Sequence, residues 1–172
     1  MFLKDNIPYE VFDVTKFGID FDFEVCAVKI PLHNFIIVSV YSSKSNNINF
    51  VNILENFLSS ISKSNFKFFI LSDFNIDVRN KLPIVNTLVN MLRSFNAYCL
   101  FSQNTRKNSC LDNVITNNDT GVIEKGVIKT ASMSDHDILF LKLNYDLRVH
   151  KSKDKPTAKC KFRLLFFRLL VF

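Results

Sequence analysis

The chain of 172 residues contains no tryptophan, three glycines, four prolines and four cysteines that form no Cys-x-x-Cys pair. So little glycine and proline leaves few turn signals, and no internal linker or repeat stands out. The cysteine spacing gives little support to a zinc site or a redox motif. Cys26, Cys99 and Cys110 lie in apolar runs typical of buried thiols, which favours a reduced, intracellular protein.

The sequence also lacks any apolar run long enough to span a bilayer, and its first residues turn polar at Lys4, which leaves no signal-peptide core. We therefore expect no membrane association. The three histidines, His33, His136 and His150, lack the spacing of zinc ligands. No Gly-x-Ser-x-Gly motif supports a serine hydrolase. The net charge of +6 is compatible with a polyanionic partner or with solubility alone.

The chain does contain a series of apolar runs that predict strands and helices. The runs 34–41 and 67–73 are nearly continuous, which predicts strands buried on both faces. Helical spacing predicts a helix that includes 50–61 and a second one that begins at Pro83. Further strands are expected at 9–14, 23–30, 97–101, 110–116, 121–128 and 137–145. Helices that lie between strands predict a layered α/β fold.

Polar residues stand at the ends of these predicted strands. Taken singly, each has a structural explanation, because Asp, Asn and Ser favour turns and caps. If the strand ends converge, they form one rim with oxygen ligands suited to Mg²⁺ and with an Asp–His pair. Such a rim has the groups needed for metal-assisted phosphodiester hydrolysis. The residues are Tyr41, Asp73, Asn75, Ser109, Asp112, Ser134, Asp135 and His136.

The same residues resemble the motifs of the endonuclease/exonuclease/phosphatase superfamily. "SDFN" is similar to its GDFN signature, "SCLDNVITN" to its S-x-LD-x-I segment, and "SDHD" to its terminal SDH. "VSVYSSK" resembles the strand that ends in the tyrosine of a YRPP-like stretch. The order and the gaps fit over roughly residues 1–145, and the closest branch is the endonuclease domain of non-LTR retrotransposons. The resemblance implies a layered β-sandwich flanked by helices.

The resemblance also implies catalytic roles for five residues. Tyr41 would contact the scissile phosphate. Asp73 would orient or deprotonate the attacking water, and Asn75 would steady the phosphate beside it. Asp112 would orient His136, which would stabilise the pentacoordinate phosphorus and its charge.

Further roles carry over to residues around this centre. Ser109, Ser134 and Arg106 would bind the substrate, and Asp135 would help to hold Mg²⁺, or Mn²⁺, through a water molecule. The implied substrate is DNA, which would place the protein in the nucleus; no oligomeric state is implied. Ser72 replaces the usual glycine before the DFN motif, and we expect it to fit less well.

The resemblance begins after the segment that carries the family's metal-binding glutamate. We therefore expect residues 1–147 to form a partial domain that lacks its N-terminal strands. Of the acids near the start of the chain, Glu24 lies among apolar strand neighbours and is expected to face outward. Residues 148–172 are expected to form a basic linker and an apolar tail. The tail segment 162–172 would dock as a terminal helix or be a spurious end of the reading frame.

Three functions remain open at this stage. The first is a Mg²⁺-dependent DNA endonuclease of a mobile element, here a truncated copy with impaired activity. The second is an inactive remnant that binds nucleic acid through Arg106, Lys107 and the basic tail. The third is a phosphatase of the same superfamily that acts on a small phosphoester.

Overall fold

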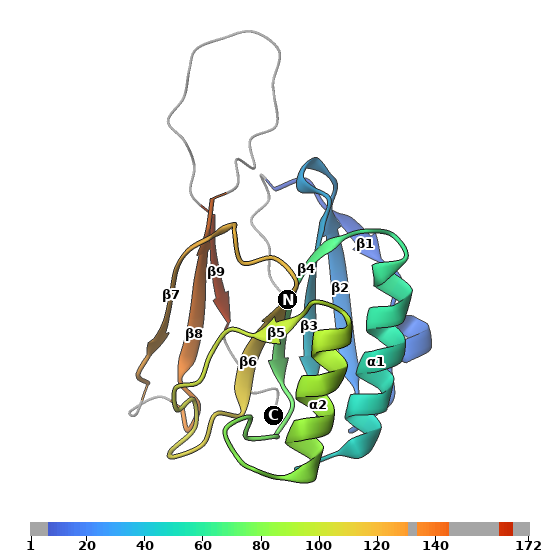
Figure 1. The fold of residues 1–172 in the computed structure, drawn as a ribbon. Helices are drawn as coiled ribbons and strands as arrows, with labels where there is room; N and C mark the ends of the chain where they lie inside the picture. Colours follow the sequence, from blue (N-terminus) through green and yellow to red (C-terminus); the bar gives the residue numbers. More distant parts are fainter. Residues whose placement is uncertain (1–6, 131–133, 145–161, 167–172) are drawn as a thin grey trace, which may run out of the picture.

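Figure 1 shows the computed structural model, which describes residues 7–130, 134–144 and 162–166, the last segment by its backbone alone. Within these residues the chain forms three layers. Two α-helices cover one face of a six-stranded sheet, and a three-stranded sheet covers its other face. The predicted layered α/β fold is confirmed.

The six-stranded sheet has the order β1-β2-β3-β4-β6-β5. β3 and β4 are parallel, and every other neighbouring pair in this sheet is antiparallel. The parallel pair requires a crossover, which contains the first helix. The strands are β1 (Glu10–Phe12), β2 (Glu24–Ile30), β3 (Phe35–Tyr41), β4 (Lys67–Asp73), β5 (Tyr98–Cys99) and β6 (Asp112–Thr116).

The smaller sheet is antiparallel throughout and consists of β7 (Val122–Ile128), β8 (Ile138–Leu143) and β9 (Phe162–Phe166). β9 comes from the segment for which a terminal helix was one expectation, and that expectation is wrong, because 162–166 pair with β8 as a strand. Residues 148–161 and 167–172, the rest of the predicted linker and tail, lie outside the described residues.

The helices begin where the sequence provides caps. The side chain of Asn47 accepts a hydrogen bond of 3.0 Å from the backbone of Asn49 at the start of α1 (Ile48–Ser62). Pro83 occupies the first turn of α2 (Pro83–Ser94). Two short 3₁₀ helices, η1 (Thr15–Phe17) and η2 (Pro31–His33), precede β2 and β3. None of the described helices is long and apolar enough to cross a membrane.

The central strands are apolar on both faces because each face has its own core. In β3, Ile36 and Val38 pack under the helices, whereas Phe35 and Ile37 pack against the smaller sheet. All of these side chains have an exposure of 0%. Successive residues of a strand point to opposite faces, so a strand between two layers needs apolar residues at every position. This explains the continuous apolar run in the sequence.

Two local expectations are wrong. Cys26, expected to be buried, is exposed. Only the later residues of β2 on its face, Val28 and Ile30, pack against the smaller sheet. The strand expected at 97–101 contains only Tyr98–Cys99. The side chain of Asn113 bonds both the N–H and the carbonyl of Phe101, at 3.0 and 2.8 Å, and so replaces the strand ladder there.

Candidate active site

One row of paired residues crosses four strands at the same edge of the large sheet. Glu24 pairs with Tyr41, Tyr41 with Asp73, and Asp73 with Asp112. Directly paired residues point to the same face of a sheet. That face is the one covered by the smaller sheet, because Leu71, two positions before Asp73 in β4, packs in the core between the two sheets. The predicted convergence of strand ends is therefore confirmed for these strands.

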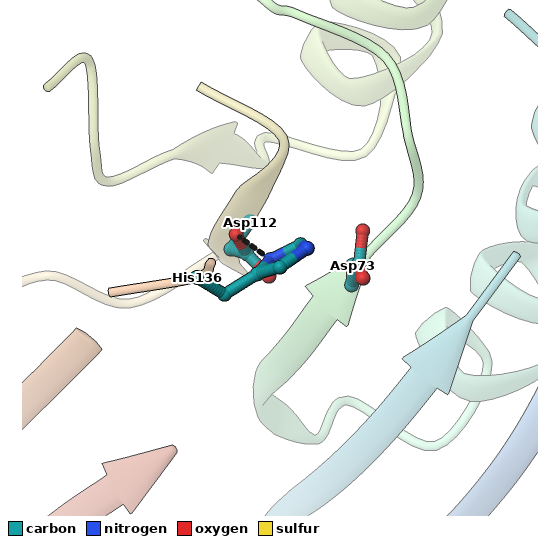
Figure 2. A group of neighbouring side chains, drawn as sticks. All are labelled: Asp73, Asp112 and His136. Atoms are coloured by element: carbon teal, nitrogen blue, oxygen red, sulfur yellow. Dashed lines mark hydrogen bonds and ion pairs between the residues drawn. The ribbon is translucent and has the colours of Figure 1, made fainter. Parts of the chain in front are cut away.

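His136 reaches this row from the segment before β8. Its Nδ1 lies 2.8 Å from Oδ2 of Asp112, and the two side chains expose only 2% and 1% of their surface. Asp73, Asp112 and His136 each offer a ligand atom within 4.8 Å of the others. Figure 2 shows the second ring nitrogen of His136 on the side of Asp73. The hydrogen bond to Asp112 fixes the ring so that this nitrogen faces the second carboxylate.

Thr105 positions both partners of the Asp–His pair, and sequence analysis missed it. Its Oγ1 accepts hydrogen bonds of 3.0 Å from the backbone N–H groups of Leu111 and Asp112. Its carbonyl accepts one of 2.7 Å from the N–H of Asp137, the residue after His136. Thr105 is completely buried, so these contacts are shielded from water. The only indication of this role in the sequence was the place of Thr105 four residues before Ser109 in "TRKNS".

The backbone of His136 is fixed by its neighbours. Its N–H donates to Oγ of Ser134 at 3.1 Å, and its carbonyl accepts from the hydroxyl of Thr130. The backbone N–H of Thr130 in turn donates to Oδ1 of Asp137 at 3.1 Å. Ser134 was predicted to bind substrate, and the structure gives its hydroxyl this local role. Contact between Ser134 and the substrate stays a prediction.

Asn75 joins the loop after β4 to the loop after β3. Its Nδ2 donates to the carbonyl of Ser42 at 2.7 Å, and the N–H of Ser42 donates to the carbonyl of Asp73 at 2.9 Å. The residue adopts a left-handed conformation with φ of 51°, which asparagine tolerates. Ser72 is completely buried, and its Oγ donates to the carbonyl of Asn113 at 3.1 Å. The expectation that serine fits poorly there is wrong.

Arg106 and Asp135 form an ion pair beside the centre, with 2.7 Å between Nη2 and Oδ2 and with side chains that are 37% and 46% exposed. Desolvation raises the pKa of Asp135, but the charges of Arg106 and His136 outweigh it and leave the pKa below its ordinary value. Asp135 is not in the group of three close donors, so the structure does not place this predicted metal ligand with them. Ser109 closes a tight turn onto Arg106 through backbone hydrogen bonds of 2.8 and 3.0 Å.

The donor set fits a hard cation. Carboxylates of Asp73 and Asp112 are the ligands that Mg²⁺ prefers, and Mg²⁺ keeps several waters while it binds one or two carboxylates. Glu24 lies two strand spacings from Asp73, about 10 Å, on the same face. It is exposed, as the sequence predicted, but sequence analysis did not recognise that its register places it in the row. Asp73 and Asp112 would therefore hold a cation together with water.

Thiol chemistry is disfavoured at this centre. Cys110 lies two residues before Asp112, and burial raises the pKa of its thiol to about 11. Burial also raises the pKa of Cys99 to about 12. Both groups stay protonated near neutral pH and are poor nucleophiles. That leaves the carboxylates and the imidazole as the candidate reactive groups of the site.

The three-layered α/β architecture is similar to that of a solved catalytic domain. The catalytic domain of human Nocturnin, solved with a bound sulfate anion, is similar over 78% of this chain with a TM-score of 0.53 and 12% sequence identity. The chain spans 59% of the length of that domain. At this identity the likeness establishes the fold and leaves the reaction to be argued from the site.

A second solved structure is an endonuclease/exonuclease/phosphatase family protein from Bacteroides thetaiotaomicron. It matches 66% of this chain and 52% of its own length, with 12% identity and a TM-score of 0.42. No family model matches the sequence. No curated protein matches it either.

Proposed function

We propose that this chain is a Mg²⁺-dependent phosphodiester hydrolase of the DNA endonuclease type. The observation that carries the proposal is the buried Asp112–His136 pair, whose donors lie within 4.8 Å of Asp73. A carboxylate that fixes an imidazole next to a second carboxylate provides a charge-stabilising group and a base in one place. The resemblance of the motifs around these residues to retrotransposon endonucleases supports DNA as the substrate.

Each residue has a defined task in this proposal. Asp73 accepts a hydrogen bond from the attacking water and takes its proton. His136, oriented by Asp112, donates a hydrogen bond to a phosphate oxygen whose charge increases in the transition state. Tyr41, in register with Asp73, contacts the same phosphate. A bound Mg²⁺ would neutralise part of the phosphate charge and polarise the phosphorus.

A low activity at ordinary Mg²⁺ concentrations is part of the proposal. Among the residues that the structure describes, the candidate cation site offers two carboxylates, and the next acid of the row, Glu24, stands about 10 Å from Asp73. Fewer anionic ligands weaken the binding of a divalent cation. We therefore expect hydrolysis to need a high concentration of Mg²⁺, and Mn²⁺ to support it as well.

A second candidate is binding of nucleic acid without hydrolysis. It is favoured by two cationic residues in one loop beside the candidate centre, Arg106, which is half-buried and paired with Asp135, and Lys107, which is exposed. In this case the chain would bind DNA with a strong dependence on salt and would leave it intact. The two candidates share the same surface and differ only in the reaction.

Conversion of supercoiled plasmid to the nicked form distinguishes the hydrolase from the protein that only binds nucleic acid. With Mg²⁺ the chain is expected to nick the plasmid, whereas EDTA, His136→Ala and Asp73→Asn each remove the activity. Glu55→Gln, an exposed position on α1, is the matched control and keeps it. Equal nicking by wild type and both site variants would show that the assigned centre does not catalyse the reaction. Binding without nicking would leave the second candidate.

A further inference from the structure

Phe21 stands at the tip of a tight turn whose backbone conformation phenylalanine does not favour. Its φ is 65°, in the left-handed region, and the residue stays 63% exposed. Six other non-glycine residues among those described have positive φ, and five of these are asparagine, which tolerates this region well. Neither the backbone conformation at this position nor burial of the side chain explains why the residue is aromatic.

The turn that carries this ring is anchored on both sides. Ile19 and Phe23 exchange backbone hydrogen bonds of 3.0 and 2.8 Å across it. The ring of Phe23 is completely buried, with its centroid 5.4 Å from that of Phe50. Phe21 is therefore exposed on a turn that backbone hydrogen bonds and the buried ring of Phe23 hold in place.

The same turn is bound to the loop that follows Tyr41. Ser43 donates to the carbonyl of Phe21 from both its N–H and its hydroxyl, at 3.0 and 3.1 Å. Lys44 forms an ion pair of 2.6 Å with Asp22. These contacts hold Phe21 at the sheet edge that carries the candidate active site.

The distance along this edge fits a nucleic acid strand. Glu24, three residues after Phe21, is two strand spacings from Asp73, or about 10 Å. Three residues span at most about 10 Å, so Phe21 lies within about 20 Å of Asp73, a distance that a strand advancing about 3.4 Å per nucleotide covers in about six nucleotides. The acidic side chains of Asp20 and Glu24 beside the tip disfavour a phosphate there. A nucleic acid that reaches this turn would therefore present a base to the ring in place of its phosphates.

We infer that Phe21 stacks on an unstacked base of a polynucleotide substrate, within about six nucleotides of the phosphate that the site cleaves. The inference rests on the proposed function and narrows its substrate to polynucleotide strands, in place of small phosphoesters. Stacking on an aromatic ring suits every base, so Phe21 adds affinity without sequence preference.

The absence of tryptophan makes Phe21→Trp a site-specific fluorescent probe. Leu32→Trp is the matched control, because Leu32 is 52% exposed and lies in η2, at the opposite end of β2 and β3. A single strand of about twelve nucleotides, added in EDTA to prevent hydrolysis, is expected to quench the fluorescence of Phe21→Trp and to leave that of Leu32→Trp unchanged.

Affinity gives an independent readout. Phe21→Asn removes the ring and suits the left-handed backbone, so we expect a melting temperature no lower than that of wild type. Its dissociation constant for the same strand is expected to rise at least tenfold, which corresponds to a loss of about 1.4 kcal/mol of binding free energy. The slope of affinity against salt concentration stays unchanged, because stacking releases no counterions. Leu32→Asn keeps the affinity of wild type.

Each result separates the inference from the function on which it rests. If a labelled strand binds but neither quenching nor the loss of affinity occurs, the role of Phe21 is refuted while hydrolysis can stand. Binding and quenching without Mg²⁺-dependent hydrolysis support the role of Phe21 and contradict the hydrolase. No binding at all refutes both. A change in Phe21→Trp fluorescence with protein concentration alone means self-association and also refutes the inference.

Discussion

Nδ1 of His136 lies 2.8 Å from Oδ2 of Asp112, although the two residues are 24 positions apart, with Asp112 in β6 of the large sheet and His136 in the segment that leads into β8 of the smaller one. Both side chains are almost completely buried. Loss of one member of such a pair leaves a polar partner without its hydrogen bond in a dry environment, which is more costly than loss of a surface contact. The link between the sheets and the geometry of the candidate site therefore depend on the same contact.

Thr105→Val is expected to destabilise the fold by about 1–3 kcal/mol, because it leaves the N–H groups of Leu111 and Asp112 buried without an acceptor. Thr105→Ser keeps the oxygen and is expected to retain most of the stability. Urea unfolding followed by circular dichroism measures both free energies. Equal stability of the two variants would contradict the role assigned to the hydroxyl.

Mg²⁺ is expected to raise the melting temperature of the wild-type chain, because a ligand that binds only the folded state stabilises it. Asp73→Asn keeps the shape of the side chain and removes one of the two carboxylates of the donor set, so its melting temperature should not respond to Mg²⁺. Glu55→Gln on α1 should respond like wild type. Identical shifts in Asp73→Asn and wild type would place the cation elsewhere.

The Asp77–Arg79 pair predicts a dependence of stability on pH. Hydrogen bonds from Arg79, the shortest 2.8 Å, lower the pKa of Asp77 below its ordinary value of 3.8. The unfolded chain keeps the ordinary value, so the pair stabilises the fold above about pH 4 and loses this contribution as the pH falls through the lower, folded value. Asp77→Asn should cost about 1 kcal/mol at pH 7 and progressively less below pH 4.

Urea unfolding at several pH values measures this difference. Glu124→Gln is the control, because Glu124 forms an exposed ion pair with Lys142, whose contribution to stability is small at any pH. A difference between Asp77→Asn and wild type that stays constant down to acid pH would show that the charge of Asp77 is not responsible.

Arg106→Ala is expected to reduce the slope of DNA affinity against salt by about one, because one phosphate contact is lost. Lys63 follows the far end of α1, away from the candidate site, so Lys63→Ala should leave the slope unchanged. Fluorescence anisotropy of a labelled duplex over a salt series measures both. The same slope for Arg106→Ala and wild type would remove Arg106 from the DNA interface.

Much of the fold could be predicted because the central strands are apolar at every position. The run 34–41 gave β3 (Phe35–Tyr41) almost to the residue, since two cores require it to be apolar on both faces. β5 was predicted too long, because the side chain of Asn113 replaces ladder bonds and periodicity does not reveal such a substitution. Side-chain bonds to distant backbone groups leave no local pattern.

The candidate site, like the fold, could be predicted only in part from the sequence. Asp73, Asp112 and His136 could be named from motifs at strand ends, and the structure places them together. Thr105 could not be named, because its contacts depend on how two loops meet. The place of Glu24 in the row depends on strand register, which the sequence leaves open when neighbouring strands are both apolar.

A double-mutant cycle on the hydrolysis rate tests the account most directly. The rate of Mg²⁺-dependent cleavage of a labelled duplex is measured for wild type, Asp112→Asn, His136→Ala and the double variant. His136→Ala should lower the rate by about 10²–10⁴-fold. Because Asp112 holds His136 and also offers a carboxylate to the cation, the double variant, assayed at saturating Mg²⁺, should lose less than the sum of the two single losses. Fully additive losses, or no loss in His136→Ala, would contradict a single centre built on this pair.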